Sequence, residues 1–279
     1  MLKYELLPEQ LLYEGTCNAS HFFEPEIPSP IHILRVHTAA YYQDLLQLTL
    51  NKRAARKLGF PLNEALVNRE LIIADGTMKA SEFALENGIA MNIAGGTHHA
   101  YSHHGEAFCL LNDQAIGARY LQYKSLAEKI LIVDLDVHQG NGTAEIFTSD
   151  PSVFTFSMHG KSNYPFKKEL SDLDIALETG ANDETYLNLL YETLPNLIEA
   201  QQPDFIYYLC GADVLASDKL GKLSLSIEGC KQRDRFVLQI CKEGNIPVMC
   251  SMGGGYSPDI KIIIEAHANT FRLAQELFF

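Results

Sequence analysis

The stretch VDLDVHQGNG, residues 133–142, follows directly on an apolar run that begins at Ile130. Such a run is typical of a buried strand, and alternate residues of a strand share a face. We therefore expect Asp134, Asp136 and His138 on one side and the apolar residues between them on the other. Two carboxylates and an imidazole on one face of an apolar strand are costly to bury unless something compensates them. A divalent cation held by oxygen and nitrogen ligands does so directly, whereas a polar strand end that faces solvent is the alternative.

A second polar cluster, GGTHHA at residues 95–100, follows another apolar stretch. Glycines let the backbone pass close to a ligand, so the adjacent residues His98 and His99 are candidates for imidazoles held where a strand meets a loop. An exposed loop is the alternative. We expect that state for His103 and His104, which follow a few residues later.

Two further apolar runs also end in small residues and one polar group. CGAD closes the run 205–209, and SMGGGY closes the run 246–250. Either one alone is weak, because glycine-rich strand ends are common turns. Four such ends in one chain indicate one site at the carboxyl edge of a sheet, where open α/β sheets bind their ligands.

Together with FCLLND at residues 108–113 and GADVLASDKLG at residues 211–221, these clusters resemble the zinc-dependent histone deacetylase family of the arginase/deacetylase superfamily. The resemblance runs from about residue 35 to the C-terminal helix, nearly the whole chain. The form DLDVHQGNG with Asn141, and SMGGGY, are most similar to the class IV branch and its bacterial relatives. Class I members usually carry aspartate at the position of Asn141.

The resemblance implies three zinc ligands, Asp136, His138 and Asp213, with positions left open for water and a substrate carbonyl, as catalytic zinc requires. Two carboxylates neutralise the charge of the ion. Water at such a site is acidified less than at a site of three histidines, so a separate general base is needed. The same ligand set is compatible with ferrous iron.

The resemblance also assigns the proton transfers. His99 would take a proton from the attacking water, a protonated histidine would later donate to the leaving amine, and Asp134 would orient His98. His99 would lean on Asn141, whose amide carries no full negative charge and should raise the pKa of His99 less than an aspartate would. We therefore expect an activity optimum at lower pH in this chain than in an Asn141→Asp variant.

Three aromatic residues match substrate-facing positions of the family. Tyr256, the tyrosine of SMGGGY, would stabilise the charge that develops on the substrate carbonyl oxygen. Phe108 and Tyr164 match the aromatic walls of the substrate tunnel, and Ala107 stands where many relatives have glycine. The resemblance further implies a structural K⁺ or Na⁺ ion. Its ligands would be the hydroxyl of Ser157 and the backbone carbonyls of Asp134, Asp136, His138 and Met158.

Composition limits the class of protein. The 279 residues, 47% of them hydrophobic, suffice for one large α/β domain over residues 1–279. The net charge of −13 argues against a general nucleic-acid binder and is compatible with cationic substrates such as lysine-rich segments or polyamines. No apolar run is long enough to span a membrane. The charged N-terminus is unlike a signal peptide, and six cysteines without a CxxC pair are typical of reduced thiols in a cytoplasmic protein.

Apolar runs alternate with helix-like stretches, which predicts an α/β fold with a central, mostly parallel sheet and helices on both faces. The proline-rich residues 25–30 are expected to form a loop. The expected strands are residues 89–93, 129–134, 153–157, 205–209 and 247–251. The expected helices are residues 39–58, 112–124, 183–200, 227–243 and 261–277.

These features predict a zinc-dependent amidohydrolase that acts on an acyl-lysine protein or peptide, with an acetyl or a longer acyl group. A hydrolase of small acylated amines, such as acetylated polyamines, shares this chemistry and is an alternative. A zinc-binding partner protein without activity is another, and it would be expected to lack the tyrosine or a histidine. A manganese enzyme of the arginase type would need ligands for a second metal ion, whereas the clusters supply one site.

Overall fold

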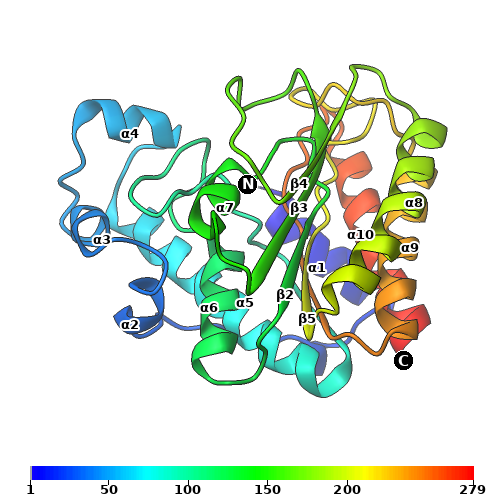
Figure 1. The fold of residues 1–279 in the computed structure, drawn as a ribbon, viewed down its shortest axis with the longest axis horizontal. Helices are drawn as coiled ribbons and strands as arrows, with labels where there is room; N and C mark the ends of the chain where they lie inside the picture. The colour runs from blue at the N-terminus through cyan, green and yellow to red at the C-terminus, as the bar shows by residue number, and fades with distance from the viewer. Residues whose placement is uncertain (1) are drawn as a thin grey trace.

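A six-stranded parallel sheet forms the centre of the protein (Figure 1), whose computed structural model describes residues 2–279. The strands lie in the order β1-β6-β5-β2-β3-β4, and every neighbouring pair is parallel. All six therefore end at the same edge of the sheet, which confirms the predicted α/β fold. The strands are β1 (Ile89–Asn92), β2 (Ile130–Asp134), β3 (Val153–Gly160), β4 (Leu173–Leu177), β5 (Phe205–Leu209) and β6 (Val248–Ser251).

Helices cover both faces of this sheet (Figure 1). One group, formed by α1, α8, α9 and α10, packs on one face, and a second group, which includes α2, α3, α5 and α6, packs on the other. The helices are α1 (Lys3–Tyr13), α2 (Pro30–Ile33), α3 (Ala39–Leu46), α4 (Lys52–Leu58), α5 (Glu64–Asn87), α6 (Asp113–Tyr123), α7 (Asn141–Phe147), α8 (Asp183–Gln201), α9 (Ile227–Glu243) and α10 (Ile260–Phe278), with a 3₁₀ turn η1 (Ala19–His21).

Alternate residues of β2 enter two separate hydrophobic cores. Leu131 and Val133 belong to the core on the α8 side, and Ile132 belongs to the core on the α5 side. β2 ends at Asp134, although the strand-like alternation of polar and apolar residues was predicted to continue to His138. Leu135 and Val137 nevertheless enter the α8-side core. The apolar residues of the motif thus anchor the loop after β2, which leaves its polar residues on the other side.

The predicted helix over residues 39–58 is wrong, because two helices occupy that range. α3 ends at Leu46, and Leu48 has a left-handed backbone with φ of 58°. The side chain of Asn51 then accepts hydrogen bonds from the backbone N–H groups of Arg53 and Ala54 and starts α4. An N-cap of this type satisfies the free N–H groups of a new first turn, so the chain changes direction here.

The elements α1, α2, α5, α7, β4 and η1 were not predicted from the sequence. The 24-residue helix α5 buries Glu70, Thr77 and Ser81 among its apolar residues, so its apolar periodicity is interrupted. β4 lies at the edge of the sheet and is only partly buried, which weakens the apolar signal of a strand. The other strands and helices lie within a few residues of the predicted ranges, and residues 22–29 form the expected loop.

The cysteines agree with the prediction of reduced thiols. All six are free, and all but Cys17 are buried. Over residues 2–279, no helix combines the length and the apolar character that a membrane crossing requires.

Candidate active site

Four neighbouring strands carry the four polar clusters at their carboxyl ends. β1, β6, β5 and β2 lie side by side in the sheet, although β2 follows β1 along the chain. The loops after these strands contain GGTHHA, SMGGGY, CGAD and VDLDVHQGNG, respectively. The strand order therefore brings the clusters together at one edge, as the sequence predicts.

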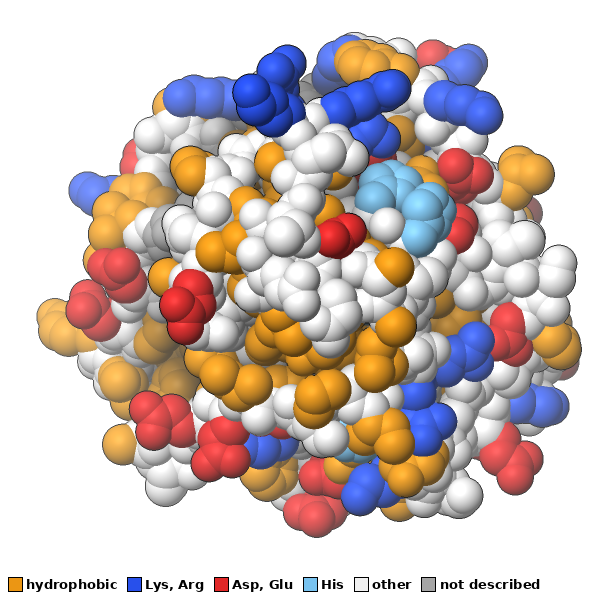
Figure 2. All heavy atoms as spheres, turned by 90° about the vertical axis from the view of Figure 1, so that its left-hand side faces the viewer, with side chains coloured by type: hydrophobic (Ala, Val, Ile, Leu, Met, Phe, Trp, Pro, Cys, Tyr) orange, Lys and Arg blue, Asp and Glu red, His pale blue; other side chains and the backbone are white. Residues whose placement is uncertain are grey.

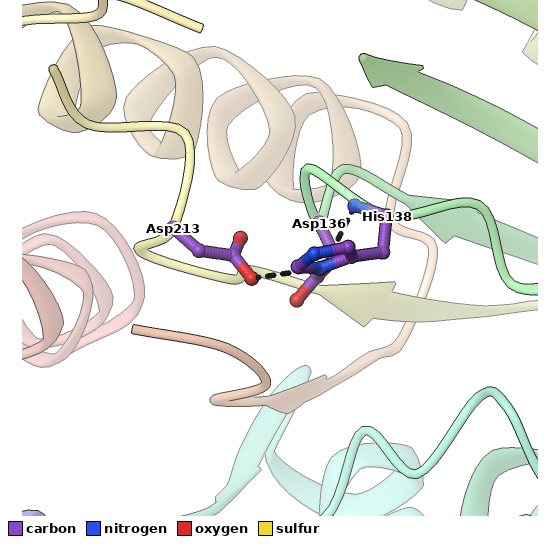
Figure 3. Close-up of side chains that lie close together, drawn as sticks. All are labelled: Asp136, His138 and Asp213. Carbon is purple, nitrogen blue, oxygen red and sulfur yellow. Dashed lines mark hydrogen bonds and ion pairs between the residues drawn. The ribbon is translucent and has the colours of Figure 1, made fainter. Parts of the chain in front are cut away.

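Asp136, His138 and Asp213 form the candidate metal centre (Figure 3). One ligand atom from each lies within 4.8 Å of the others, and all three side chains are buried. His138 Nδ1 lies 3.0 Å from Asp136 Oδ1 and 3.2 Å from Asp213 Oδ2. Among residues 2–279 this is the one group of three with metal-ligand geometry, so a second, arginase-like metal position is not formed by the described residues.

The electrostatics of this group fit a bound cation. Burial and the charge of Asp136 raise the pKa of Asp213 to about 6. Burial lowers the pKa of His138, but the two carboxylates outweigh it and raise that pKa to about 10. Two buried carboxylates that converge on one nitrogen therefore demand positive charge, and the oxygen and nitrogen donors suit a divalent metal ion.

The backbone around these ligands is held in place by a buried arginine and a glycine. Arg233 of α9 is fully buried, and its Nη1 donates to the carbonyls of Leu135 and Gly211, which lie in the two ligand-bearing loops. The backbone N–H of Gly254 donates to Asp136 Oδ2 at 2.9 Å. A Cβ atom at Gly254 would overlap the Asp213 carboxylate, so only glycine permits this approach.

The two adjacent histidines each contact a different partner. His98 Nδ1 lies 2.7 Å from Asp134 Oδ2, and His99 Nδ1 lies 2.6 Å from Asn141 Oδ1. Burial lowers the pKa of His98, but the charge of Asp134 outweighs it, so that this pKa is raised. Burial and the charge of His98 place the pKa of His99 well below its usual range. The pair is therefore electrostatically asymmetric, with His99 as the neutral member.

Glu106, which the sequence reasoning did not single out, stands behind Asn141. The Asn141 amide donates to Glu106 Oε1 at 2.7 Å and to the hydroxyl of Tyr101 at 3.0 Å. His99 is therefore linked to a carboxylate through one amide. We predicted from the sequence that His99 leans on a residue without a negative charge. That prediction is incomplete, because Glu106 lies on the other side of the Asn141 amide. An acidic residue two positions before Phe108 was the available signal.

Glu106 also contacts Tyr164 and Lys57, which come from different segments around the candidate substrate tunnel. The hydroxyl of Tyr164 donates to Glu106 Oε1 at 2.6 Å, and Lys57 Nζ lies 3.2 Å from Glu106 Oε2. Burial raises the pKa of Glu106, but hydrogen bonds from His104, Tyr164 and Asn141 outweigh it and lower that pKa. The Glu106 side chain is therefore ionised and accepts hydrogen bonds from these neighbours.

A cavity of about 330 Å³ contains the metal centre, both histidines and the tyrosine of SMGGGY. The Phe108 ring, 39% exposed, packs 4.9 Å from the Phe60 ring, and the Tyr164 ring lies 5.0 Å from the His99 ring. The predicted wall residues thus line this cavity. His103 is exposed and His104 partly so, in the loop where they were expected.

The wall around Phe108 has an unusual backbone. Ala107 and Phe108 have φ of 47° and 70°, in the left-handed region that favours glycine. Their N–H groups donate to the carbonyls of Lys57 and Leu58, the last residues of α4. The end of α4 therefore holds this wall against the cavity.

Tyr256 and Lys3 meet at the glycine-rich loop after β6. Tyr256 lines the cavity, and its backbone N–H donates to Asp218 Oδ2 at 2.6 Å. Lys3 of α1 is 4% exposed, and its Nζ donates to the carbonyl of Gly253 at 2.6 Å. A lysine near the N-terminus gave no sequence signal for this contact, because only the packing of α1 brings it here.

Three of the five expected monovalent-cation ligands, Asp134, Ser157 and Met158, lie on adjacent strands, and Asp136 and His138 follow in the loop after β2. β2 and β3 pair Asp134 with Ser157, and Met158 follows Ser157 in the buried part of β3. The hydroxyl of Ser157 lies 2.9 Å from His159 Nδ1. Binding of K⁺ or Na⁺ at this position stays a prediction.

Comparison with known proteins agrees with this geometry. The sequence pattern of the histone deacetylase domain matches residues 2–271. An uncharacterized protein of Picosynechococcus sp. is 42% identical over 278 residues, covering 100% of this chain and 93% of its own length. Histone deacetylase 2 of Arabidopsis thaliana is 30% identical over 274 residues, covering 94% of this chain and 70% of its own length.

A solved structure shares the fold. The crystal structure of an HDAC homolog complexed with SAHA matches with a TM-score of 0.83 and 26% identity, over 98% of this chain and 76% of that chain. With a family match over nearly the whole chain and a metal-ligand group at the edge of a parallel sheet, the chain belongs to the histone deacetylase family.

Proposed function

We propose that the protein hydrolyses the amide of an acylated lysine, with Zn²⁺ held by Asp136, His138 and Asp213. The observation that carries this proposal is the convergence of the three ligands, two histidines and a tyrosine in one cavity. When bound, the ion would supply Lewis acidity toward a carbonyl oxygen and would lower the pKa of water. The residues around it supply the proton transfers and the substrate contacts.

His99 has the hydrogen-bond pattern of a general base. Its Nδ1 lies 2.6 Å from the carbonyl oxygen of the Asn141 side chain, an acceptor, so Nδ1 carries the hydrogen. The other ring nitrogen then keeps a free lone pair. Because the lowered pKa of His99 keeps it neutral, that nitrogen can accept a proton from the attacking water.

His98 is suited to hold a positive charge. Its Nδ1 donates to the Asp134 carboxylate, and its Nε2 lies 3.9 Å from Asp136 Oδ1. The charge that develops beside it during hydrolysis is therefore balanced by fixed carboxylates. Neighbouring groups whose pKa values are pushed apart are typical of acid–base pairs, and the proton taken up by this pair would return to the leaving amine.

Tyr256 can donate a hydrogen bond to the substrate oxygen. Burial and the charge of Asp213 raise the pKa of Tyr256 far above neutrality. Its hydroxyl therefore stays protonated, as a donor to a developing oxyanion must be. The aromatic rings of Phe108 and Tyr164 would enclose the lysine alkyl chain on the way to these groups.

Hydrolysis of one lysine peptide that carries an acetyl, octanoyl or myristoyl group tests this proposal. The zinc-loaded protein should remove the acyl group, as the carboxylic acid, from the lysine of at least one of the three peptides, and Tyr256→Phe should lose most of that activity. Preference for the long chains would indicate that the cavity extends past the metal centre, and preference for acetyl would indicate a short slot. Equal rates for wild type and variant on all three peptides would refute it.

A further inference from the structure

The mouth of the cavity is basic, although the protein as a whole is acidic. Three segments supply its rim: residues 50–69, 160–170 and 214–224, which contribute Phe60, Phe166 and Leu220 to the lining. These segments hold ten of the 22 lysines and arginines and only three of the 35 acidic residues. These three segments together carry a formal charge of +7, against −13 for the whole chain, and two of their cations, Arg69 and Lys222, line the cavity itself.

Most of these rim cations have no carboxylate partner. Within residues 2–279, the exposed α4 residues Lys52, Arg53 and Arg56 form no ion pair, and Lys222 Nζ bonds only the carbonyl of Ser162. Lys168 Nζ likewise contacts backbone carbonyls. Away from the rim, some cations are paired with acidic side chains, as in Lys79–Asp75, Arg119–Asp150, Arg235–Glu276 and Arg272–Glu14, and others, such as Lys124 and Lys129, form no ion pair among the described residues.

The acidic residues near the mouth accept hydrogen bonds from neighbouring groups of the protein. Asp218 accepts hydrogen bonds from the backbone N–H groups of Leu220, Gly221 and Tyr256. Glu169 accepts from the Tyr101 hydroxyl. Figure 2 shows Lys and Arg side chains gathered along the upper edge of the face on which α4 lies. The three acidic residues of these segments are outnumbered by ten cations, so a net positive charge faces a bound substrate.

The innermost part of the mouth is apolar. Phe166 is 92% exposed and Leu220 46% exposed, and both line the cavity together with the Phe60–Phe108 pair. An uncharged acyl-lysine side chain fits between these side chains. The groups that flank it must then meet the basic rim, which repels a polyamine or a lysine-rich tail and attracts carboxylates.

We propose that the substrate is an acylated lysine within an acidic sequence, a peptide or protein segment with Asp or Glu on either side. This rests on the proposed acyl-lysine hydrolysis and names its substrate class. The net charge of the chain is compatible with cationic substrates, but the charge near the mouth has the opposite sign. The exposed rim charges act through solvent, so their effect should weaken at high salt.

Three peptides with one acyl-lysine flanked by Glu, Gln or Lys test the proposal, with the acyl group that is hydrolysed best. At low salt, kcat/KM should fall by on the order of tenfold from the Glu to the Gln peptide and again to the Lys peptide. The ratios should shrink at 0.3 M NaCl, where the Debye length is about 6 Å, compared with about 20 Å at 0.02 M. Direct binding of the same peptides to the zinc-loaded protein should follow the same order.

A charge-reversal variant and a matched control complete the test. The double variant Arg53→Glu/Arg56→Glu changes two exposed α4 residues and lowers the charge of the three segments from +7 to +3, so it should reduce the preference for the Glu peptide over the Lys peptide severalfold. Lys124→Glu/Lys129→Glu makes the same charge change near the start of β2, at the opposite edge of the sheet, and should leave that preference unchanged.

Equal kcat/KM for the Glu and Lys peptides, preference for the Lys peptide, or equal effects of the two double variants would overturn the basic-rim proposal and leave acyl-lysine hydrolysis standing. Hydrolysis of none of the peptides, with binding still ordered by charge, would instead refute the hydrolytic function.

Discussion

Replacing Asn141 by aspartate should create a conflict between two buried carboxylates. The Asn141 amide donates to Glu106 Oε1 at 2.7 Å and to the Tyr101 hydroxyl at 3.0 Å, while its carbonyl accepts from His99. In Asn141→Asp the carbonyl contact to His99 survives, but the donor to Glu106 is replaced by a second negative charge. Asn141 and Glu106 are 1% and 8% exposed, so solvent offers little relief.

The size of the repulsion follows from the distance between the two carboxylates. Two carboxylates whose charges lie about 4 Å apart repel by about 4 kcal/mol at the effective dielectric constant of 20 that suits protein sites. Lys57 Nζ, 3.2 Å from Glu106, offsets part of this. We expect Asn141→Asp to lower the free energy of unfolding at pH 8 by about 3 kcal/mol. A repulsion of this size raises the pKa of one carboxyl by about two to three units.

The loss in the free energy of unfolding caused by Asn141→Asp should grow as the pH rises. A carboxyl whose folded-state pKa is raised binds its proton more tightly in the folded protein, so stability is highest below its unfolded pKa of about 4 and falls as the pH rises toward about 7. Most of the stability loss caused by Asn141→Asp should therefore develop between pH 5 and pH 8. Urea denaturation at these two values, for wild type and variant, measures this.

The double variant Asn141→Asp/Glu106→Gln is the control, because it moves the carboxylate next to His99 and returns an amide to the neighbouring position. Its stability at pH 8 should recover by at least about 2 kcal/mol relative to Asn141→Asp, an interaction energy that a double-mutant cycle isolates. Equal stability of Asn141→Asp and wild type at pH 8, or a cycle energy near zero, would show that the two carboxylates do not repel each other. The double variant is also the fair test of the expected higher pH optimum with aspartate beside His99.

Three further outcomes are expected. Tyr256→Phe should lower kcat by about 100- to 1000-fold with an unchanged metal content by elemental analysis, and retention of a tenth of the activity would exclude the donor role. Added Zn²⁺ at about 100 times its Kd should stabilise the protein by about 2.7 kcal/mol, a shift in thermal unfolding that a chelator reverses and that Asp213→Ala should abolish; an equal shift in that variant would place the metal elsewhere. Burial raises the pKa of Glu70 from 4.5 to about 7, so its contribution to stability is lost as the pH rises through that window. Glu70→Gln should therefore raise the free energy of unfolding at pH 8 by up to roughly 3 kcal/mol with little change at pH 4, and denaturation curves that gain equally at both pH values would contradict this.

The local features of the site were predictable from the sequence because they are written in consecutive residues. An apolar run that ends in Asp134 and Asp136 predicts a buried strand with polar ligands at its end, and the apolar partners Leu135 and Val137 are indeed in the core. The four strand ends were recognised for the same reason. Where polar residues interrupt the apolar pattern, as Glu70 and Thr77 do in α5, the prediction missed the element.

The sequence alone predicts the candidate ligands and histidines, the parallel α/β class and the family resemblance. Which further side chains complete the site depends on the tertiary structure. Glu106 reaches Asn141, Lys3 reaches the loop after β6, and Arg233 joins the two ligand-bearing loops through contacts between residues far apart in the chain. The same holds for charge. Net charge is a sum over residues, but the potential at the mouth depends on which of them lie near it, and that is set by the packing of distant segments around one cavity.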